Sequence, residues 1–306
     1  MTHRLLIPAA LLLAAFQPVS DTPEQPSLWT DKGYPRWTDA QMEPPAFPTP
    51  PEGATEIDVN INGYVLGLKM IDADYSGWVS PADAGRGGYA LKSDLKTAGL
   101  GALLQKLRIW AVTSGAWDSA GLHPRYHLQQ NRDKKRRRVD MRYGSGEVAV
   151  SVIPPNGSQG VPPASPAERF AADDTISALL HVMLRRQWSE SGAPCEGIIP
   201  VFDSKQHYNL RLVNRGQENF RKDGYRGPVT RCDIYYEPVS GFDPEDLPDA
   251  EEGSTPIKAW LAPVQGVGRT WDVPIRFSYK ISGFKAVMKV DDLRMRFPDG
   301  RVVEMD

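Results

Sequence analysis

The sequence predicts a mainly β fold, in which a strongly curled antiparallel sheet or open barrel has one main helix packed on its concave side. Two observations lead to this prediction. Apolar and polar residues alternate along several long segments, which is the pattern of strands with one buried face and one wet face. Only one segment, residues 174–188, has a strong helical pattern. Long bent strands form curled sheets, and such sheets have a concave face.

The folded part of the chain opens with a strand whose alternation changes phase. Ile57, Val59 and Ile61 share one face, and after Gly63 the apolar positions continue from Tyr64 in the other phase. A glycine at such a change indicates a β-bulge or bend that keeps the apolar side facing inward. We therefore expect a long first strand that curls.

The C-terminal region predicts an antiparallel meander. Residues 271–281 form its first strand, and Ser282-Gly283 turns the chain into a returning strand over residues 284–290. Residues 293–297 form a third strand, which Asp299-Gly300 closes. The residues expected on the buried face of the first strand are Trp271, Val273, Ile275, Phe277, Tyr279 and Ile281, and those expected outside are Asp272, Arg276, Ser278 and Lys280.

The main helix is expected over residues 174–188, with Asp173 or Asp174 as its N-terminal cap. A weaker helical pattern covers residues 95–107, where two glycines interrupt it. The apolar stripe of the main helix consists of Ile176, Leu179, Leu180, Met183 and Leu184.

Three parts follow one another along the chain. Residues 1–20 have the pattern of a secretory signal peptide, with Arg4 before a short apolar run that is followed by small residues. That run is shorter than the roughly 20 residues of a membrane-spanning helix. Residues 21–54 are a Pro-rich flexible leader, and residues 55–306 are a β-rich envelope domain. We expect a periplasmic protein without a transmembrane span after signal cleavage.

The composition is that of an ordinary globular protein. The hydrophobic content of 41% supports a sizeable core, and the net charge of −2 lacks the basic surplus of a nucleic-acid binder. We expect no nucleic-acid partner and no cofactor.

The chain has two cysteines, Cys195 and Cys232. In an oxidising compartment an even pair is most simply a disulfide, and two buried free thiols are the alternative. Cys232 alternates with Ile234 and Tyr236, which puts it on the expected core face. Two cysteines are too few for a structural zinc site, so no metal is expected.

No catalytic residue is assigned. Asp203, Ser204 and His207 lie close together in the sequence, but members of a catalytic triad come from separate elements. We expect a tight turn between strands there. His123 and His127 would point the same way on one strand, yet no further ligand lies nearby in the sequence to complete a metal site.

A run of five basic residues lies between expected strands and should project at a hairpin end. It is a candidate contact for the phosphates of anionic lipid or lipopolysaccharide. A solvated charged hairpin that protects an edge strand is the alternative, and we favour it. The run consists of Lys134, Lys135, Arg136, Arg137 and Arg138.

Several short pieces occur in an order and spacing shared with a known family. They are residues 96–100 and 174–178, Cys195, the turn at 201–203 with Tyr208, and Cys232 followed by Tyr236-x-Pro238-x-x-Gly241-Phe242. From about residue 55 onward the chain resembles the bacterial domain of unknown function 3108. Thr175 and Ser204 depart from it, because the family pattern has proline and glycine there. The resemblance implies an envelope protein of Gram-negative bacteria and supplies no enzyme, cofactor or catalytic residue.

These observations favour a non-catalytic role in the cell envelope. The hypothesis is that the concave face binds an apolar or amphipathic envelope molecule, such as a lipid, or that the protein has a structural role in envelope maintenance. A periplasmic hydrolase acting on an envelope component is the alternative, and it should show acid and base groups clustered in the cavity. A transmembrane β-barrel fits the long strands but not the leader or the helix.

Overall fold

A computed structural model of the 306-residue chain describes residues 43–104, 106–132, 136–281 and 283–305. The expected signal peptide, residues 1–20, lies outside the described residues, as does the leader up to residue 42. Lys134 and Lys135 of the basic run also lie outside them.

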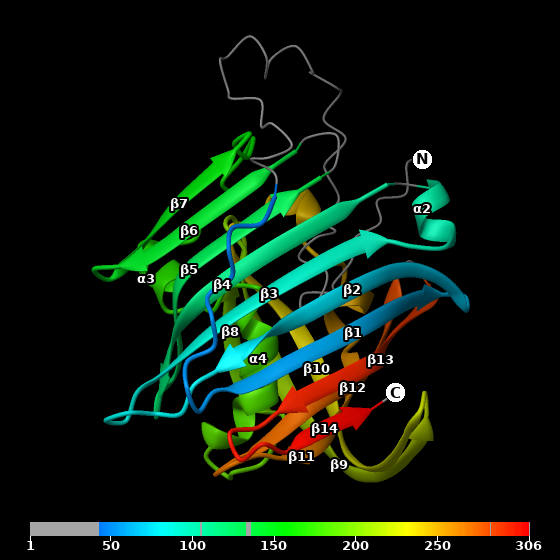
Figure 1. The fold of residues 1–306 in the computed structure, drawn as a ribbon. Coiled ribbons are helices and arrows are strands. Elements are labelled where there is room, and N and C mark those ends of the chain that lie inside the picture. Colours follow the sequence, from blue (N-terminus) through cyan, green and yellow to red (C-terminus); the bar gives the residue numbers. More distant parts are fainter. Residues whose placement is uncertain (1–42, 105, 133–135, 282, 306) are drawn as a thin grey trace.

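One fourteen-stranded sheet dominates the fold (Figure 1). The strands of the N-terminal half are β1 (Thr55–Val65), β2 (Leu68–Val79), β3 (Gly87–Thr97), β4 (Arg108–Asp118), β5 (Gly121–Asn131), β6 (Arg138–Gly144) and β7 (Glu147–Ile153). Those of the C-terminal half are β8 (Glu196–Phe202), β9 (His207–Lys222), β10 (Tyr225–Ser240), β11 (Ile257–Gln265), β12 (Thr270–Ile281), β13 (Phe284–Arg296) and β14 (Val302–Met305). The helical segments are α2 (Leu100–Leu104), α3 (Pro166–Phe170), α4 (Ser177–Leu184), η2 (Arg185–Gln187), η3 (Pro244–Asp246) and α5 (Ala250–Ser254).

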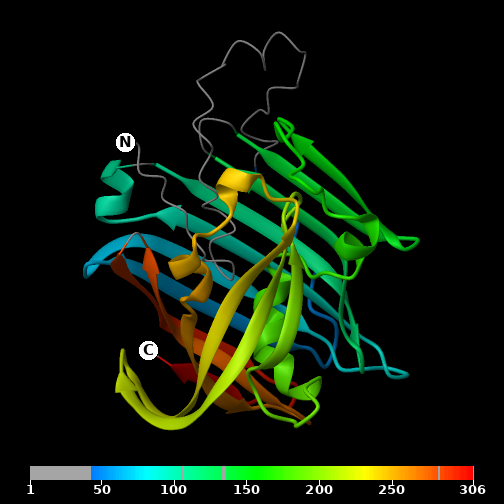
Figure 2. The same cartoon turned by 180° about the vertical axis from the view of Figure 1, so that it is seen from behind.

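The sheet is two antiparallel meanders joined in the middle. Strands β1 to β7 pair in sequence order, strands β8 to β13 do the same, and β1 pairs with β13. Among the described strands, β7 and β8 are therefore the two ends, and they do not pair with each other. The sheet curls around α4, and the chain passes from β7 through α3 and α4 to β8 (Figures 1 and 2). The prediction of a mainly β fold with one strongly curled antiparallel sheet is confirmed.

Irregular pairing accompanies the curl in the first strand. The register of β1 against β2 shifts between Gly63 and Tyr64, where the sequence predicts a bulge, so that prediction is confirmed. A Cβ atom on Gly63 would lie 3.1 Å from the Cβ atom of Ile71. The small residue therefore lets the two strands keep close contact where β1 bends.

Helix α4 lies inside the curl and is buried on every side. All eight of its residues are buried, and it contacts β5, β8 and β12. Its side chains are part of the main apolar core, together with residues such as Tyr75 and Leu261 from the strands. The helix is shorter than expected, because it begins at Ser177 rather than at residue 174 and is followed by η2. The side of the sheet that α4 covers is filled by protein.

The expected separation of the second and third strands of the C-terminal meander is wrong, because residues 284–296 form the single strand β13 and the turn at Asp299-Gly300 leads into β14.

The first strand of the C-terminal meander, β12, is buried on both faces. Phe277 and Ile275 are buried and Lys280 is exposed, as predicted. The expected exposure of Asp272, Ser278 and Arg276 is wrong. The physical reason is cover on both sides of β12. Two hydrogen bonds of 2.7 and 3.0 Å join the η2 residue Arg186 to buried Asp272, and the end of the β9–β10 hairpin packs over Arg276.

The weaker helical pattern over residues 95–107 is mostly wrong. Strand β3 continues to Thr97, β4 starts at Arg108, and only the five-residue α2 lies between them. Gly99 has a φ of +54°, a conformation that favours glycine and interrupts a helix. Residues 95 and 96 and the start of β4 pair with each other in the sheet. This strand pairing outweighs the weak local preference for a helix.

The end of the leader, residues 43–54, lies against the outer face of the sheet (Figure 1). Phe47 packs beside Trp110, Val112 and Leu128, and Lys92 lies over its ring. The indole of Trp78 donates a hydrogen bond to the Pro48 carbonyl at 2.9 Å. This described part of the leader is therefore in contact with the domain.

Candidate functional site

A buried polar cluster lies at the N-terminus of α4. We call Asp174, Ser177, Thr113, His127 and Tyr89 the Asp174 cluster. Asp174 and Ser177 come from the start of the helix, whereas the other three come from the strands β4, β5 and β3. Because the helix crosses the inside of the curl, residues far apart in the sequence meet here.

Asp174 caps the helix and ties it to the sheet. Its Oδ1 accepts hydrogen bonds from the backbone N–H groups of Ile176 and Ser177, at 2.9 and 3.0 Å. Its Oδ2 lies 2.6 Å from the hydroxyl of Ser177 and 2.7 Å from that of Thr113. His127 Nδ1 lies 3.0 Å from Oδ1. The residue directly before α4 is Ile176, which makes no side-chain cap bond. The Asp174 side chain nevertheless takes the hydrogen-bonding role predicted for a cap at Asp173 or Asp174, and it also connects the helix to β4 and β5.

Burial and charge act in opposite directions on this carboxyl. Burial raises the pKa of Asp174, but the positive charge of His127 and the hydrogen bonds from the two hydroxyls outweigh it and hold the pKa below its ordinary value. Burial, together with the negative charge of Asp174, raises the pKa of Tyr89 well above its usual range. The Tyr89 hydroxyl therefore stays protonated, 2.9 Å from Ser177 Oγ.

A second carboxylate–histidine pair lies next to the cluster. His181 Nδ1 lies 2.6 Å from Asp173 Oδ2, and the Trp188 ring meets the imidazole edge-on at 4.9 Å. The Asp173 backbone bonds to Pro200 and Phe202 of β8, at 2.9 and 2.8 Å. Burial raises the pKa of Asp173, although His181 opposes this. This pair fixes the start of α4 to the sheet edge at β8.

The geometry of the Asp174 cluster does not fit a hydrolase. In a serine triad the hydroxyl bonds to histidine and the histidine to the carboxylate. Here the Ser177 hydroxyl bonds directly to Asp174. Asp174 and Ser177 are fully buried and the His127 side chain is 3% exposed, so a substrate does not reach them from solvent. The arrangement can hold the helix in place; it does not present a nucleophile.

The sequence analysis found only part of this cluster. The sequence predicts Asp173 or Asp174 as a cap and offers His127 as half of a metal pair that no further ligand completes, but no sequence pattern connects Asp174 with His127 or points to Thr113 and Tyr89. The piece 174–178 that carries the family resemblance was the one signal that pointed to this place. No local pattern marks a strand residue that meets a helix cap about sixty positions later.

The run with Asp203, Ser204 and His207 forms a turn, as expected. It joins β8 to β9, and Asp203 Oδ1 accepts hydrogen bonds from the backbone of Lys205 and Gln206, at 3.0 and 2.8 Å. Ser204 has a φ of +96°, the conformation for which the family pattern has glycine. The His207 ring lies 3.8 Å from Glu168, so these residues do not form a triad.

His123 and His127 point to different places, so the expected common direction is wrong. His123 Nε2 lies 3.0 Å from Asp118 and is partly exposed, whereas His127 is buried against Asp174. The pairing of β4 with β5 skips Arg125, and one extra residue in a strand reverses which face the following side chains take. Among the described residues, no group of three or more metal-ligating side chains converges.

The two cysteines are joined by a disulfide in the main apolar core. Cys195 lies immediately before β8 and Cys232 lies in β10, with their Cα atoms 5.7 Å apart. Both are fully buried. The bond therefore links the chain that leaves α4 to the middle of the C-terminal meander.

The described part of the basic run lies in the connection from β5 to β6. Arg136 and Arg137 are partly buried, and their backbone carbonyls accept hydrogen bonds from the buried Gln130 amide, at 3.1 and 3.0 Å. Arg138 begins β6. The position at a hairpin end agrees with the prediction, and anion binding by this run stays a prediction.

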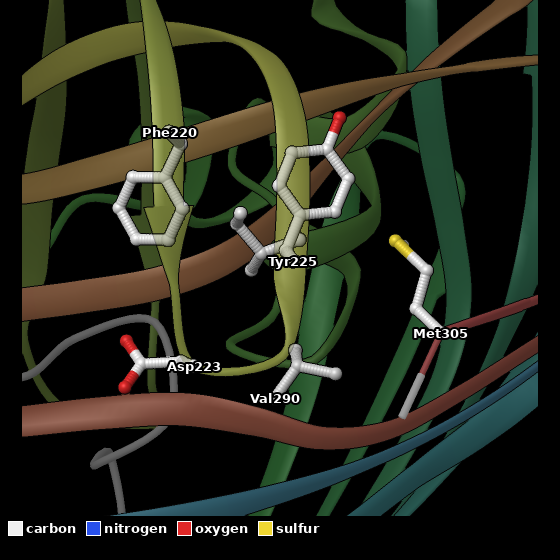
Figure 3. Close-up of a pocket in the computed structure, with 6 residues that line it drawn as sticks. Phe220, Asp223, Tyr225, Val290 and Met305 are labelled. Atoms are coloured by element: carbon white, nitrogen blue, oxygen red, sulfur yellow. The ribbon is translucent and has the colours of Figure 1, made fainter.

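A small hollow lies where the β9–β10 hairpin curls against the sheet (Figure 3). Its volume is about 10 Å³, which is room for about one water molecule. Asp223 at the hairpin end pairs with Arg276 and lies 3.8 Å from Lys289. The hollow is a packing gap under the β9–β10 hairpin, whose end is held by the Asp223–Arg276 ion pair, and it is too small for a ligand. The other lining residues are Phe220, Tyr225, Ile275, Val290 and Met305.

Comparison with known proteins identifies relatives but no activity. The sequence model of DUF3108, a protein of unknown function, matches residues 63–289. No curated protein matches the chain. A crystal structure of a β-barrel-like protein of domain of unknown function DUF1849 from Brucella abortus has 10% identity and a TM-score of 0.45, over 80% of this chain and 98% of that one. A "putative lipoprotein" from Parabacteroides distasonis has 9% identity and a TM-score of 0.33, over 79% and 95%.

The described helices of this protein are short. Within the part of the chain that the structure describes, none is long and apolar enough to cross a bilayer.

Proposed function

Since this chain belongs to the DUF3108 family of proteins of unknown function, we propose from its own residues that it is an exported, periplasmic envelope protein with a non-catalytic role, binding an amphipathic envelope molecule at its outer surface. The observation that carries the proposal is the closed interior. The concave side is occupied by α4, and the polar groups that meet there serve as a cap and cross-link.

The expectation that the ligand binds on the concave face is wrong, because α4 occupies that side, and we therefore propose the outer surface. Binding sites for small molecules are typically cavities of roughly 300–1,000 Å³. All eight residues of α4 are buried, so the helix takes the space that a ligand on the concave face would need. The proposed partner is still a lipid or another amphipathic envelope molecule. Only the surface proposed to bind it differs from the one expected from the sequence.

Two features support a location outside the cytoplasm. The signal-like sequence of residues 1–20 is typical of export. The buried disulfide between Cys195 and Cys232 is stable in an oxidising compartment and rare in a reducing one. The two features are independent, because one lies outside the domain and the other lies in its core.

Fractionation of cells that express the untagged full chain tests this function. We expect the protein in the periplasmic or envelope fraction, with an intact mass lowered by loss of a segment of about 20 residues and by the two hydrogen atoms that disulfide formation removes. Free-thiol labelling under denaturing conditions should label neither cysteine without reductant. A full-length chain in the cytoplasm with two labelled cysteines would overturn the proposal.

The non-catalytic role is tested with Ser177→Ala. Serine hydrolases in the envelope fraction are labelled by fluorophosphonate probes, because the probe reacts with an activated serine. We expect no labelling of the purified protein and no difference between wild type and Ser177→Ala. Labelling that is lost in Ser177→Ala would show a working nucleophile and favour the hydrolase.

A further inference from the structure

One end of the curled sheet carries exposed, large apolar side chains on three neighbouring connections. These are the β1–β2 turn, the α2 segment between β3 and β4, and the β12–β13 turn, and they lie side by side because β3, β2, β1, β13 and β12 are consecutive in the sheet (Figures 1 and 2). We call the six exposed residues the apolar rim, and their exposed fractions lie between 41% and 82%. They are Leu66, Leu68, Leu100, Leu103, Leu104 and Phe284.

The backbone holds the α2 part of the rim in place. A Cβ atom on Gly99 would lie 2.5 Å from the Lys69 carbonyl oxygen, and one on Gly101 would lie 2.3 Å from that of Met70. The Ala98 N–H donates to the same Met70 carbonyl at 2.9 Å. The short helix is therefore fixed against the start of β2. Its leucines at 103 and 104 point away from the domain, with 82% and 73% of their surface exposed.

Lysines surround these apolar side chains. Lys280 and Lys285 lie directly opposite each other across β12 and β13, and Lys106 is exposed after α2. Like charges directly opposite in a sheet destabilise it, and an anion between them removes the repulsion. Acidic groups lie here as well: Glu251 of α5 is 3.9 Å from Lys280 and neighbours Asp249 and Glu252, and Asp72 lies close to Lys69 and Lys96.

We propose that the apolar rim docks the protein on the surface of a lipid bilayer that contains anionic phospholipid. This rests on the proposed function, because it names the envelope molecule and the surface that binds it. Leu103, Leu104 and Phe284 insert among the acyl chains near the head groups. Lys280 and Lys285 contact the phosphates.

The chemistry of the rim favours a bilayer over a protein partner. Protein interfaces are typically depleted of lysine around their apolar core. Exposed leucine and phenylalanine flanked by lysine are typical of segments that lie in a membrane interface. The rim also consists of turns and one short helix at strand ends, which project rather than form a groove. A large exposed apolar patch marks a binding surface. The lysines next to this patch favour a bilayer with anionic head groups as the partner.

Vesicle sedimentation tests the proposal, with the exported chain and vesicles of phosphatidylethanolamine and phosphatidylglycerol. We expect binding that weakens in vesicles of phosphatidylcholine alone and at high salt. The double variant Leu103→Ser/Leu104→Ser should lower the partition coefficient at least about tenfold, because each leucine loses its transfer into the acyl region. Lys280→Gln/Lys285→Gln should lower it by about thirtyfold and remove part of the salt dependence, since each basic residue contributes about 1 kcal/mol at such a surface.

Val267→Ser is the matched control, because Val267 is 52% exposed in the β11–β12 turn at the other end of the sheet. It should bind vesicles as the wild type does. Equal binding by the wild type and the two rim variants, with unchanged thermal unfolding, would overturn the proposal. So would dimers in lipid-free buffer that the leucine variant abolishes, because the rim would then be a contact between copies. Either result leaves the fractionation test of the proposed function standing.

Discussion

At the scale of single residues, one carboxyl group organises the inside of this protein. Asp174 accepts two backbone hydrogen bonds at the start of α4 and lies within hydrogen-bond distance of the hydroxyls of Ser177 and Thr113. If the carboxylate were removed, the backbone N–H groups of Ile176 and Ser177 would lose this acceptor, whereas the hydroxyl of Thr113 would keep the Tyr126 carbonyl and that of Ser177 would keep Tyr89. A buried polar group that loses its partner destabilises a protein by about 1–3 kcal/mol.

Asp174→Ala should therefore destabilise the protein by about 2–4 kcal/mol, since it removes the acceptor of two backbone hydrogen bonds at the helix start and the buried partner of two hydroxyls. Urea unfolding followed by tryptophan fluorescence measures this. Asp292→Asn, on an exposed position of β13, is the control and should leave the unfolding midpoint unchanged. A loss below about 1 kcal/mol for Asp174→Ala would mean that the cluster is not needed to hold the helix.

The contribution of Asp174 should depend on pH. Its pKa is held below the ordinary value in the folded protein, so the stabilisation is present above the unfolded pKa, about 3.9, and is lost as pH falls through the folded pKa. The difference in unfolding free energy between wild type and Asp174→Asn should thus be full at pH 6 and smaller at pH 3. A difference for Asp174→Asn that is constant between these pH values would contradict the assignment.

The raised pKa of Asp173 acts in the opposite direction, so the folded state of the wild type should lose stability from this group as pH rises. The unfolding free energy of Asp173→Asn should therefore rise relative to that of the wild type between pH 3 and pH 6.

At the scale of elements, the alternation of apolar and polar residues predicts which side chains of a strand are buried only where one face of the strand meets solvent. Strand β12 is covered by α4 and η2 on one side and by the β9–β10 hairpin on the other. Its register against β11 also skips Ile275, which packs in a smaller cluster with Phe220 and Val229, whereas Phe277 belongs to the main core. One bulge and two covering elements thus explain why the expected outer face is not exposed.

Phe277→Ala should destabilise the protein by about 3–5 kcal/mol, because the side chain is 4% exposed and its removal leaves a cavity in the main core. Phe284→Ala, in the adjoining strand, is the control, since Phe284 is 52% exposed. It should change the unfolding free energy by less than about 0.5 kcal/mol. Equal losses for the two variants in urea unfolding would mean that the burial of the strand is wrong.

Gly101→Ala should destabilise the protein by about 1–3 kcal/mol, as overpacking does, because the new Cβ would meet the Met70 carbonyl. Gly144→Ala is the control, since that Cβ would have open space and needs no special backbone conformation. Thermal unfolding compares the two. An unchanged melting temperature for Gly101→Ala would show that α2 is not fixed against β2.

At the scale of the whole molecule, two meanders and a helix close around each other. The pairing of β1 with β13 joins the first meander to the last, and α4 occupies the concave side. The disulfide connects the segment after α4 to β10, so it restrains the chain that leaves the interior.

Cys195→Ser/Cys232→Ser should destabilise the protein by roughly 4 kcal/mol, the entropic value for a cross-link between cysteines 37 positions apart. The wild type in reductant should lose a similar amount once its disulfide has been reduced during unfolding. Urea unfolding with and without reductant measures both. A double variant as stable as the oxidised wild type would show that the bond contributes nothing to the fold.

Local patterns in the sequence determined the first strand and its bulge at Gly63, the strand over residues 271–281, the single main helix and the cysteine pair, because each depends on neighbours within a few residues or on composition. The filled concavity, the burial of Asp272 and the two directions of His123 and His127 depended on the tertiary structure. The physical reason is that these features arise from contacts between distant segments and from one-residue shifts in strand pairing. Such a shift turns the following side chains to the opposite face of the sheet, although the local sequence pattern does not show it. The apolar rim belongs to this second group, since only the order of strands in the sheet brings its three connections together.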